Sequence, residues 1–437
     1  MGELRHISSK ELIIYWCIFV STLILTSAVV ALLININKRK EEARQYPLQI
    51  VEIDPDEPDS GVWGKNFPRQ FESLSMTEKD SGRTKYGGSE QFQHLDENLN
   101  LKRLFAGYSF SIDYKEDRGH VHALKDAIET KRLSGKKPGT CMTCKGSQVP
   151  KLMKEVGGPA EFYKTPFDEL IKKIHGEKSG IGCADCHDSK TMELKISRPA
   201  FKEAMEAQGI DLSKATRHQM RSYVCGQCHA EYYFKGDGKY LVFPWKKGLN
   251  IDDIEAYYDE QGFKDWVHPD SNAPLVKMQH PDFELWSTGV HARSNVSCAD
   301  CHMPYKREGG IKVSDHWVKS PLKSINQSCQ TCHRWSEDEL KGWVEGVQDR
   351  TAKLMREAEL AMLDAIDAIT EAETKGAREE ELKEARIFHR RSHIRWDFIS
   401  SENSMGFHSP QEAARILGEA IDFARQAQIA AIKTKKE

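Results

Sequence analysis

The sequence predicts a mainly α-helical protein with little β structure, in which an irregular central region precedes long C-terminal helices. Between residues 61 and 335 the chain is rich in Gly, Pro and short irregular segments. No alternation of apolar and polar residues persists there for the length of a strand. From Glu337 onward, apolar residues such as Trp343, Val347 and Leu354 recur close to the helical period. These two observations place the regular helices in residues 336–437.

An uncharged apolar run of 23 residues, 12–34, lies near the N-terminus. A run of this length spans a bilayer, and it exceeds the apolar region of a signal peptide, which has about 7–15 residues. We therefore expect an uncleaved membrane anchor over 12–34, with residues 1–11 on the cytoplasmic side. The alternative is a signal peptide cleaved at the weak site Thr26-Ser27-Ala28. Basic residues flank both ends of the run, so charge alone leaves the orientation open.

The remaining boundaries follow from turn and cap signals. Residues 35–60 are expected to be a linker, because 46–60 carry three prolines and five acidic residues. The first long helix begins at Glu337 and ends at the break Thr374-Lys375-Gly376, and two more cover 378–402 and 410–434. Ser409 and Pro410 open the last of them. Helices of this kind are expected to form scaffold, and equally an oligomer interface.

Ten of the eleven cysteines form five CxxC pairs in the central region. A CxxCH motif is typical of covalent c-type haem attachment, because both thiols add to haem vinyl groups and the histidine binds the iron. The four copies with histidine are Cys183, Cys186 and His187; Cys225, Cys228 and His229; Cys298, Cys301 and His302; and Cys329, Cys332 and His333. The other copy has Cys141, Cys144 and Lys145, so an amine would replace imidazole on that iron. Cys17, in the apolar run, is expected to be a buried inert thiol.

Other uses of CxxC fit less well. Zinc ribbons place their pairs about 15–20 residues apart, whereas the steps from Cys144 to Cys183 and from Cys186 to Cys225 are both 39. Structural disulfides do not explain the histidines, and thioredoxin-like chemistry needs one pair, not five.

Five haems would replace much of the protein core, so we expect one haem-packed unit over 61–335 in this chain of 437 residues. Covalent haem attachment implies export, which directs the body to the periplasm or the cell exterior. The net charge of −3 is small, and nothing suggests a nucleic-acid partner.

The second iron ligands are less certain from spacing. An electron-transfer haem takes two protein ligands, and an iron that does chemistry keeps one position open. Thirteen of the 17 histidines lie outside the CxxCH motifs. Spacing alone does not separate the candidates His120, His291, His316 and His408 from His94, His122, His218 and His393.

Short segments in a fixed order resemble the pentahaem cytochrome c nitrite reductases, which are periplasmic and form ammonia. The resemblance extends from Phe105 to the C-terminus. The matching segments are Phe105-Ala106-Gly107-Tyr108, Arg118-Gly119-His120, the CxxCK motif, Glu231-Tyr232-Tyr233-Phe234, Lys277-Met278-Gln279-His280-Pro281, Cys301-His302-Met303-Pro304 and Arg395-Trp396-Asp397. The resemblance implies a mostly helical fold with closely packed haems, and a homodimer formed by the long C-terminal helices.

The resemblance also implies the ligands and site residues. The distal haem ligands would be His120, His291, His316 and His408, and Lys145 would be the sole protein ligand of the catalytic haem. The active-site residues would be Arg132, Tyr232 and His280, with Arg118 as the neighbouring alternative arginine. One calcium ion would bind the side chains of Glu231 and Gln279 and the carbonyls of Tyr232 and Lys277. The cofactors would be five haem c groups and this calcium.

These residue types suit nitrite, an anion that takes up six electrons and several protons on its way to ammonium. Arg132 and His280 can attract the anion and hydrogen-bond its oxygens, and Tyr232 offers a hydroxyl. Lys145 must lose its proton to bind iron. The expected partners are nitrite and a membrane quinol-oxidising multihaem cytochrome as electron donor, with hydroxylamine or sulfite as side substrates.

Two rival functions remain. A membrane-anchored multihaem electron carrier would need only CxxCH motifs, so the CxxCK motif and the long C-terminal helices argue against it. A different multihaem reductase, acting on hydroxylamine, tetrathionate or sulfite, is the second rival. The octahaem relatives would need three more attachment motifs, which this chain does not contain.

Overall fold

The structure is a computed structural model that describes residues 8–42, 49–79, 81–132, 137–174, 180–309 and 311–434, with side chains of residues 39–42 left out. Residues 1–7 of the expected cytoplasmic segment and 43–48 of the expected linker lie outside the described residues. Contacts divide the chain into two units, one of residues 1–50 with 307–313 and one of residues 51–306 with 314–437.

Helix α1 (Ser9–Glu42) contains the predicted apolar run. Its window Ser9–Lys38 has a mean hydropathy of 2.6 and is not buried, so by length and composition it is able to cross a membrane, as a signal sequence near the N-terminus also would be. Cys17 is exposed on this helix. The expectation of a buried thiol is therefore wrong for this structure, because α1 is exposed along its described length.

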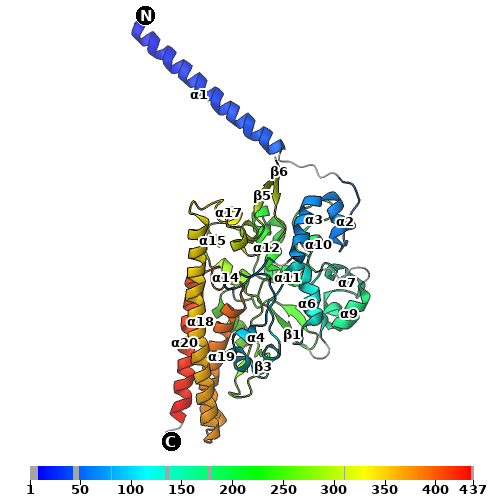
Figure 1. The fold of residues 1–437 in the computed structure, drawn as a ribbon, viewed down its shortest axis with the longest axis vertical. Coiled ribbons are helices and arrows are strands. Elements are labelled where there is room, and N and C mark those ends of the chain that lie inside the picture. Colours follow the sequence, from blue (N-terminus) through cyan, green and yellow to red (C-terminus); the bar gives the residue numbers. More distant parts are fainter. Residues whose placement is uncertain are drawn as a thin grey trace, which may run out of the picture. The chain divides into compact units, whose positions relative to one another are not determined.

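Three long helices, α18 (Glu337–Thr374), α19 (Glu379–Ser401) and α20 (Pro410–Lys433), pack side by side (Figure 1). The predicted boundaries agree with these within one residue. Ser336 caps α18 in a capping box with Glu339, and Gly376 lies in the left-handed region at φ 90°, as expected of a residue that ends a helix. Pro410 opens α20, although the Ser409 side chain makes no capping hydrogen bond.

The central region consists of short helices joined by irregular segments. The α-helices are α2 (Ser60–Asn66), α3 (Pro68–Ser75), α4 (His94–Glu97), α5 (Asn100–Leu104), α6 (Ala123–Glu129), α7 (Val149–Glu155), α8 (Pro159–Lys164), α9 (Phe167–Lys173), α10 (Cys183–Cys186), α11 (Pro199–Ala207), α12 (Arg217–Gly226), α13 (Ile251–Glu260), α14 (Asp282–Ser287), α15 (Val290–Arg293), α16 (Cys298–His302) and α17 (Ile325–Ser328). The 3-10 helices are η1 (Met76–Glu78), η2 (Ser109–Ser111), η3 (His120–His122), η4 (Gly139–Met142), η5 (Leu212–Lys214) and η6 (Pro321–Lys323).

Strands are few and short among the described residues. Three two-stranded sheets are present: β1 (Tyr233–Lys235) with β2 (Tyr240–Val242), β3 (Trp266–Val267) with β4 (Pro274–Leu275), and β5 (Tyr305–Glu308) with β6 (Ile311–Ser314). The first two pairs are antiparallel. The predicted mainly helical class with little β structure is confirmed.

Part of the expected linker packs against the central region. Ile53 is buried in a small cluster with Trp63 and Ala184, and the Trp63 indole Nε1–H donates to the carbonyl of Glu57. The prolines and acids of residues 46–60 predict a linker, whereas the structure buries Ile53 of this segment against Trp63 of the central region.

Two larger apolar clusters position the site. One joins α18–α20 to residues around Phe105, Tyr258 and Met278. The other surrounds the CxxCK segment and includes Met142, Phe162, Phe201, Trp245 and Phe283. The CxxCK motif and the segment 277–283 both contribute residues to these two clusters. Packing of the clusters therefore fixes the position of both segments.

Candidate active site

Two of the CxxC motifs form short helices whose caps come from the motif itself. The motifs at Cys183 and Cys298 both read Cys-Ala-Asp-Cys-His. In α10 the Asp185 carboxylate accepts the backbone N–H of Gly182 at 2.8 Å, and in α16 the Asp300 carboxylate accepts the N–H and the hydroxyl of Ser297 at 2.8 and 2.7 Å. The aspartate between the cysteines therefore shapes the turn that presents both thiols on one side.

Arg198 ties three motifs together. This guanidinium is fully buried, forms an ion pair with Asp185, and donates to the carbonyls of Thr143 (2.5 Å) and Gly146 (3.2 Å) on either side of Lys145. Gln227, inside the third motif, donates to the carbonyl of Asp185 at 3.0 Å. Neighbouring motifs also lie close together, since the free thiol of Cys144 interacts with that of Cys228 and the free thiol of Cys225 with that of Cys298.

The four predicted distal histidines each lie opposite a different CxxCH histidine. The ring centres are 6.1–6.4 Å apart in the pairs His120–His229, His187–His316, His291–His333 and His302–His408. Two imidazoles bonded to one metal ion at about 2 Å have ring centres about 6 Å apart. The spacing in these four pairs suits two imidazoles on one iron. The His280 ring lies 6.2 Å from the His229 ring and so shares this spacing with His120, which means that for this motif His120 remains the choice implied by the resemblance.

Lys145 lies in a small pocket together with Arg132 and Asp117. The Arg132 guanidinium stacks over the Phe110 ring, 4.5 Å from its centre. Arg118, the alternative arginine, is instead engaged in an ion pair with Asp126. Burial opposes ionisation of Asp117, but the charges of Lys145, His280 and Arg132 together lower its pKa below the ordinary value. The pocket thus mixes charges of both signs: its lining carries the cations Lys115, Arg132 and Lys145 and the carboxylates Glu116, Asp117, Asp126 and Glu129.

His280 and Tyr232 do not line this pocket, but they interact electrostatically with Lys145 and Arg132, which do. The His280 ring is 6.2 Å from the His229 ring, and its buried Nδ1 has no hydrogen-bond partner among the described residues. Burial, followed by the charge of Lys145, lowers the pKa of His280 to about 4. Burial also raises the pKa of the Tyr232 phenol well above its usual value, and the groups that interact with it electrostatically include Cys144 and Arg132. Both residues therefore lie near the CxxCK motif, as expected.

The predicted calcium residues come from two segments that meet beside β1. Glu231 is fully buried, and its carboxylate accepts the Tyr258 hydroxyl at 2.7 Å and the backbone N–H of Gln279 at 2.5 Å. Gln279 Nε2 donates to the carbonyl of Lys277 at 3.2 Å, which brings an amide and a carbonyl to the same place. Burial raises the Glu231 pKa well above its ordinary value.

The nearby ammonium of Lys277 does not hydrogen-bond Glu231. It donates to Asp397 at 2.9 Å and to Ser401 at 2.6 Å. A buried carboxylate that receives only neutral donors is costly, and a hard cation prefers oxygen donors such as a carboxylate, an amide and carbonyls. The residues around Glu231 therefore fit a calcium ion.

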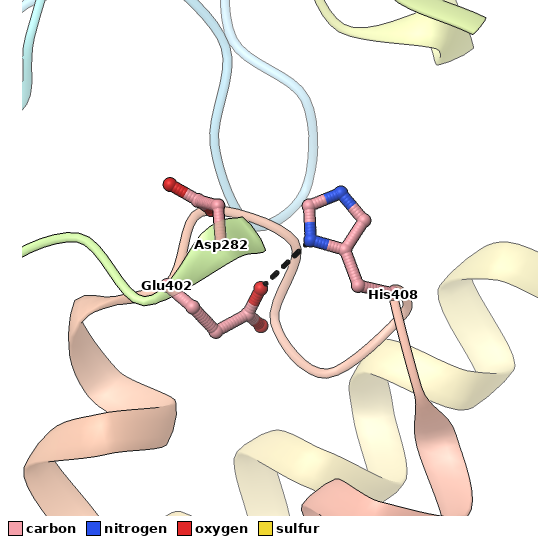
Figure 2. A group of neighbouring side chains, drawn as sticks. All are labelled: Asp282, Glu402 and His408. Carbon is pink, nitrogen blue, oxygen red and sulfur yellow. Dashed lines mark ion pairs between the residues drawn. The ribbon is translucent and has the colours of Figure 1, made fainter. Parts of the chain in front are cut away.

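Three features of the site were not predicted. They are the buried clamp Arg198, the pocket carboxylate Asp117, and a group of three side chains, Asp282, Glu402 and His408, whose ligand atoms lie within 4.8 Å of one another (Figure 2). Asp117 directly precedes the Arg118-Gly119-His120 segment, which is the one signal in the sequence that could have drawn attention to it. The other two depend on contacts between distant segments.

Comparisons with known proteins show the family of this chain. The family described as cytochrome c552 matches residues 59–437. A cytochrome c-552 of Parabacteroides distasonis is 42% identical over 426 residues, covering 96% of this chain and 85% of the relative. One from Porphyromonas gingivalis is 41% identical over 423 residues, covering 95% and 84%.

A solved structure is similar over most of its length. It is the catalytic subunit of the cytochrome c nitrite reductase of Desulfovibrio desulfuricans, described in terms of its two calcium sites. It superposes with a TM-score of 0.82 at 32% identity, covering 88% of each chain.

The paired imidazoles, the five CxxC motifs and the helical fold define a multihaem c-type cytochrome with an oxidoreductase site. The chain belongs to the cytochrome c552 family. The family predicted from the short matching segments, that of the cytochrome c nitrite reductases, is thereby confirmed, as are the enzyme class and the haem c cofactors.

Proposed function

We propose that this protein reduces nitrite to ammonium, a six-electron reaction, at the haem attached through Cys141 and Cys144 and held by Lys145. The observation that carries the proposal is the shared pocket of Lys145 and Arg132, which pairs the divergent haem motif with an anion-binding side chain. The four facing histidine pairs support electron supply through haems with two histidine ligands each.

The chain's own residues bind and protonate the substrate in this proposal. When bound, the haems would supply the electrons of the reaction one at a time. Arg132 attracts the anion and donates hydrogen bonds to its oxygens, since a guanidinium fork suits two acceptors at once. His280, whose buried Nδ1 has no partner among the described residues, donates to an oxygen or delivers a proton. Tyr232 adds a hydroxyl that binds or protonates the intermediate stages.

The calcium ion, held by Glu231, Gln279 and the carbonyls of Tyr232 and Lys277, would fix the segments that carry Tyr232 and His280. Both active-site residues directly adjoin a proposed ligand in the sequence. The ion would also compensate the buried charge of Glu231.

We further propose that the enzyme lies at the periplasmic face of the cytoplasmic membrane, anchored by α1. A membrane quinol-oxidising multihaem cytochrome would supply its electrons, and two copies would dimerise through α18–α20. Hydroxylamine and sulfite are proposed as side substrates, because both are small and are reduced by the same kind of open iron. The length and apolar character of α1 support the anchor.

The deciding experiment measures ammonium formed from nitrite by the holoprotein with a reduced dye. His280→Asn should slow the reaction by about 10²–10⁴-fold, the usual contribution of a general acid–base group, while the spectra of the four bis-histidine haems stay unchanged. His218→Asn is the matched control, since His218 lines a different cavity, apart from Lys145. A wild type that takes up electrons but forms no ammonium would establish the carrier function instead.

A further inference from the structure

Two carboxylates face histidines that would bind haem iron. The Asp282 carboxylate lies 3.2 Å from Nδ1 of His229, and the Glu402 carboxylate lies 3.2 Å from Nδ1 of His408, as Figure 2 shows for the second pair. When Nε2 of a histidine binds a metal, Nδ1 carries the proton and donates it to its neighbour. The Asp282 carboxylate is thus placed to accept a hydrogen bond from a haem ligand, whereas the Glu402 carboxylate lies at ion-pair distance from Nδ1 of His408 without the geometry of a hydrogen bond, so its negative charge acts on that ligand through space.

Other haem histidines meet neutral acceptors at the same ring nitrogen. Nδ1 of His187 lies 2.9 Å from the carbonyl of Met192, and Nδ1 of His302 lies 3.1 Å from that of Lys319. Nδ1 of His316 lies 2.9 Å from the carbonyl of Ser314. The haem between His187 and His316 therefore has carbonyl partners on both sides, which makes it an internal reference.

Residues of the loop between α19 and α20 donate hydrogen bonds to both carboxylates. Asn403 donates to Asp282 from its backbone N–H at 2.8 Å and from its side-chain amide at 3.0 Å. Ser404 donates to Glu402 from its backbone N–H and from its hydroxyl, both at 3.0 Å. Asp282 and Glu402 are buried, so solvent does not screen them. His408 belongs to the same loop and is the proposed ligand of a haem iron. We therefore interpret the cluster of Asp282, Glu402 and His408 as a group that supports haem ligands and not as a separate cation site.

We propose that Asp282 and Glu402 are positioning residues that lower the reduction potentials of two haems, those bound by His120 with His229 and by His302 with His408. A carboxylate charge beside Nδ1 makes the imidazole a more basic ligand, which favours ferric over ferrous iron. Each iron still gains one electron on reduction, and Nδ1 keeps its proton in both states. The inference rests on the haem ligands of the proposed function.

The lowered reduction potential would matter most at the haem bound by His120 and His229, because of where this haem lies. Arg198 donates both to Gln227 inside the attachment motif of this haem (3.1 Å) and to the carbonyl of Thr143 inside the CxxCK motif (2.5 Å), so the attachment site of this haem adjoins that of the catalytic one. A low potential at the last donor increases the driving force for electron transfer into the site where nitrite would be reduced.

The test is a potentiometric titration of the holoprotein, with each low-spin haem followed by electron paramagnetic resonance. In Asp282→Asn, which keeps an acceptor but removes the charge, one midpoint should move to more positive potential; in Glu402→Gln a different one should move. A tenfold change in relative affinity for the two oxidation states corresponds to about 59 mV for one electron. A His120→Ala variant identifies the first signal, because it removes one ligand of that haem.

Asp315→Asn is the matched control. Asp315 directly precedes the haem ligand His316, but its carboxylate binds Ser73 and Lys319 and not an imidazole. Unchanged midpoints in Asp282→Asn and Glu402→Gln proteins that hold five haems, or an equal shift in Asp315→Asn, would overturn the proposal. If the Asp282→Asn protein cannot be isolated with five haems, the midpoint shift of Glu402→Gln alone tests the proposal. A wild type without four low-spin signals would refute the proposed haem ligands instead, which separates the two failures.

Discussion

Lys145 is the residue by which one haem attachment site differs from the other four. An amine binds a metal through its nitrogen lone pair, which an imidazole-bound iron does not require of a lysine. Arg132 and Asp117 line the pocket with it. The lysine thus lies among charged groups that a bis-histidine haem would not need.

Replacing Lys145 with histidine should keep all five haems but lower nitrite turnover. The two thiols still attach the haem, whereas the ligand opposite the open position changes from an aliphatic amine to an aromatic imidazole. The measurement is haem content by pyridine haemochrome assay together with ammonium formation. A variant that is isolated with four haems, or one with wild-type turnover, would contradict this role.

Arg198→Leu should destabilise the protein by about 3–5 kcal/mol, because it leaves the buried Asp185 carboxylate without its partner. Arg83→Ala provides the control, since Arg83 pairs with Glu97 at the surface, where ion pairs contribute about 0–1 kcal/mol. Denaturant midpoints of the two holoproteins make the comparison. Equal midpoints would show that Arg198 does not clamp the CxxCK loop.

Sequence could identify the attachment residues but not their partners. A histidine that follows CxxC is recognised by spacing alone, whereas a distal histidine such as His316 is selected by the fold, 129 positions from His187. The resemblance supplied the four distal candidates, and the geometry pairs them. Asp282 and Glu402 escaped notice because buried carboxylates carry no local pattern that distinguishes them from surface ones.

At the scale of elements, the long helices were predictable and the strands were not. The break at Thr374-Lys375-Gly376 and the opening at Ser409 and Pro410 are strong end signals, so α18–α20 begin and end within one residue of expectation. Strands such as β3 and β4 have two residues each, too few for an alternating pattern. They matter nonetheless, because the proposed calcium residues adjoin β1 and β4.

Glu231→Ala should lower nitrite reduction, and excess calcium should partly restore it. The change removes one carboxylate from a cation that would order Tyr232 and His280, which weakens binding without abolishing it. Turnover is measured against added calcium, with Tyr258→Phe as a control that removes one hydrogen bond to Glu231 but no proposed ligand. Full activity of the wild-type protein after thorough chelation would contradict the calcium assignment.

On the scale of the whole molecule, one apolar helix and five haem motifs together imply a location. Covalent haem attachment is expected outside the cytoplasm, and α1 is long enough to hold the protein at a membrane. The amino-acid sequence alone is enough to predict this location. Whether α1 is retained depends on a peptidase, which recognises a few residues near Ala28 and not the fold.

Protein extracted from membranes should retain residues 1–28. Intact-mass spectrometry measures this and the number of covalent haems in one experiment. A chain that begins after Ala28, found in the soluble fraction, would show that the segment is a signal peptide. Deleting residues 1–42 behind a cleavable signal should release the enzyme with its nitrite turnover unchanged, because the candidate site lies wholly within residues 51–306 and 314–437.

The contacts of Cys144 with Cys228 and of Cys225 with Cys298 carry a consequence for biogenesis. Each joins thiols of two different motifs, and an oxidising compartment turns adjacent thiols into disulfides by exchange. In a chain that reached this fold in such a compartment before receiving its haems, we would expect these cysteines to cross-link and block two attachment sites at a time. We therefore expect the thioethers to form before the fold brings these thiols together.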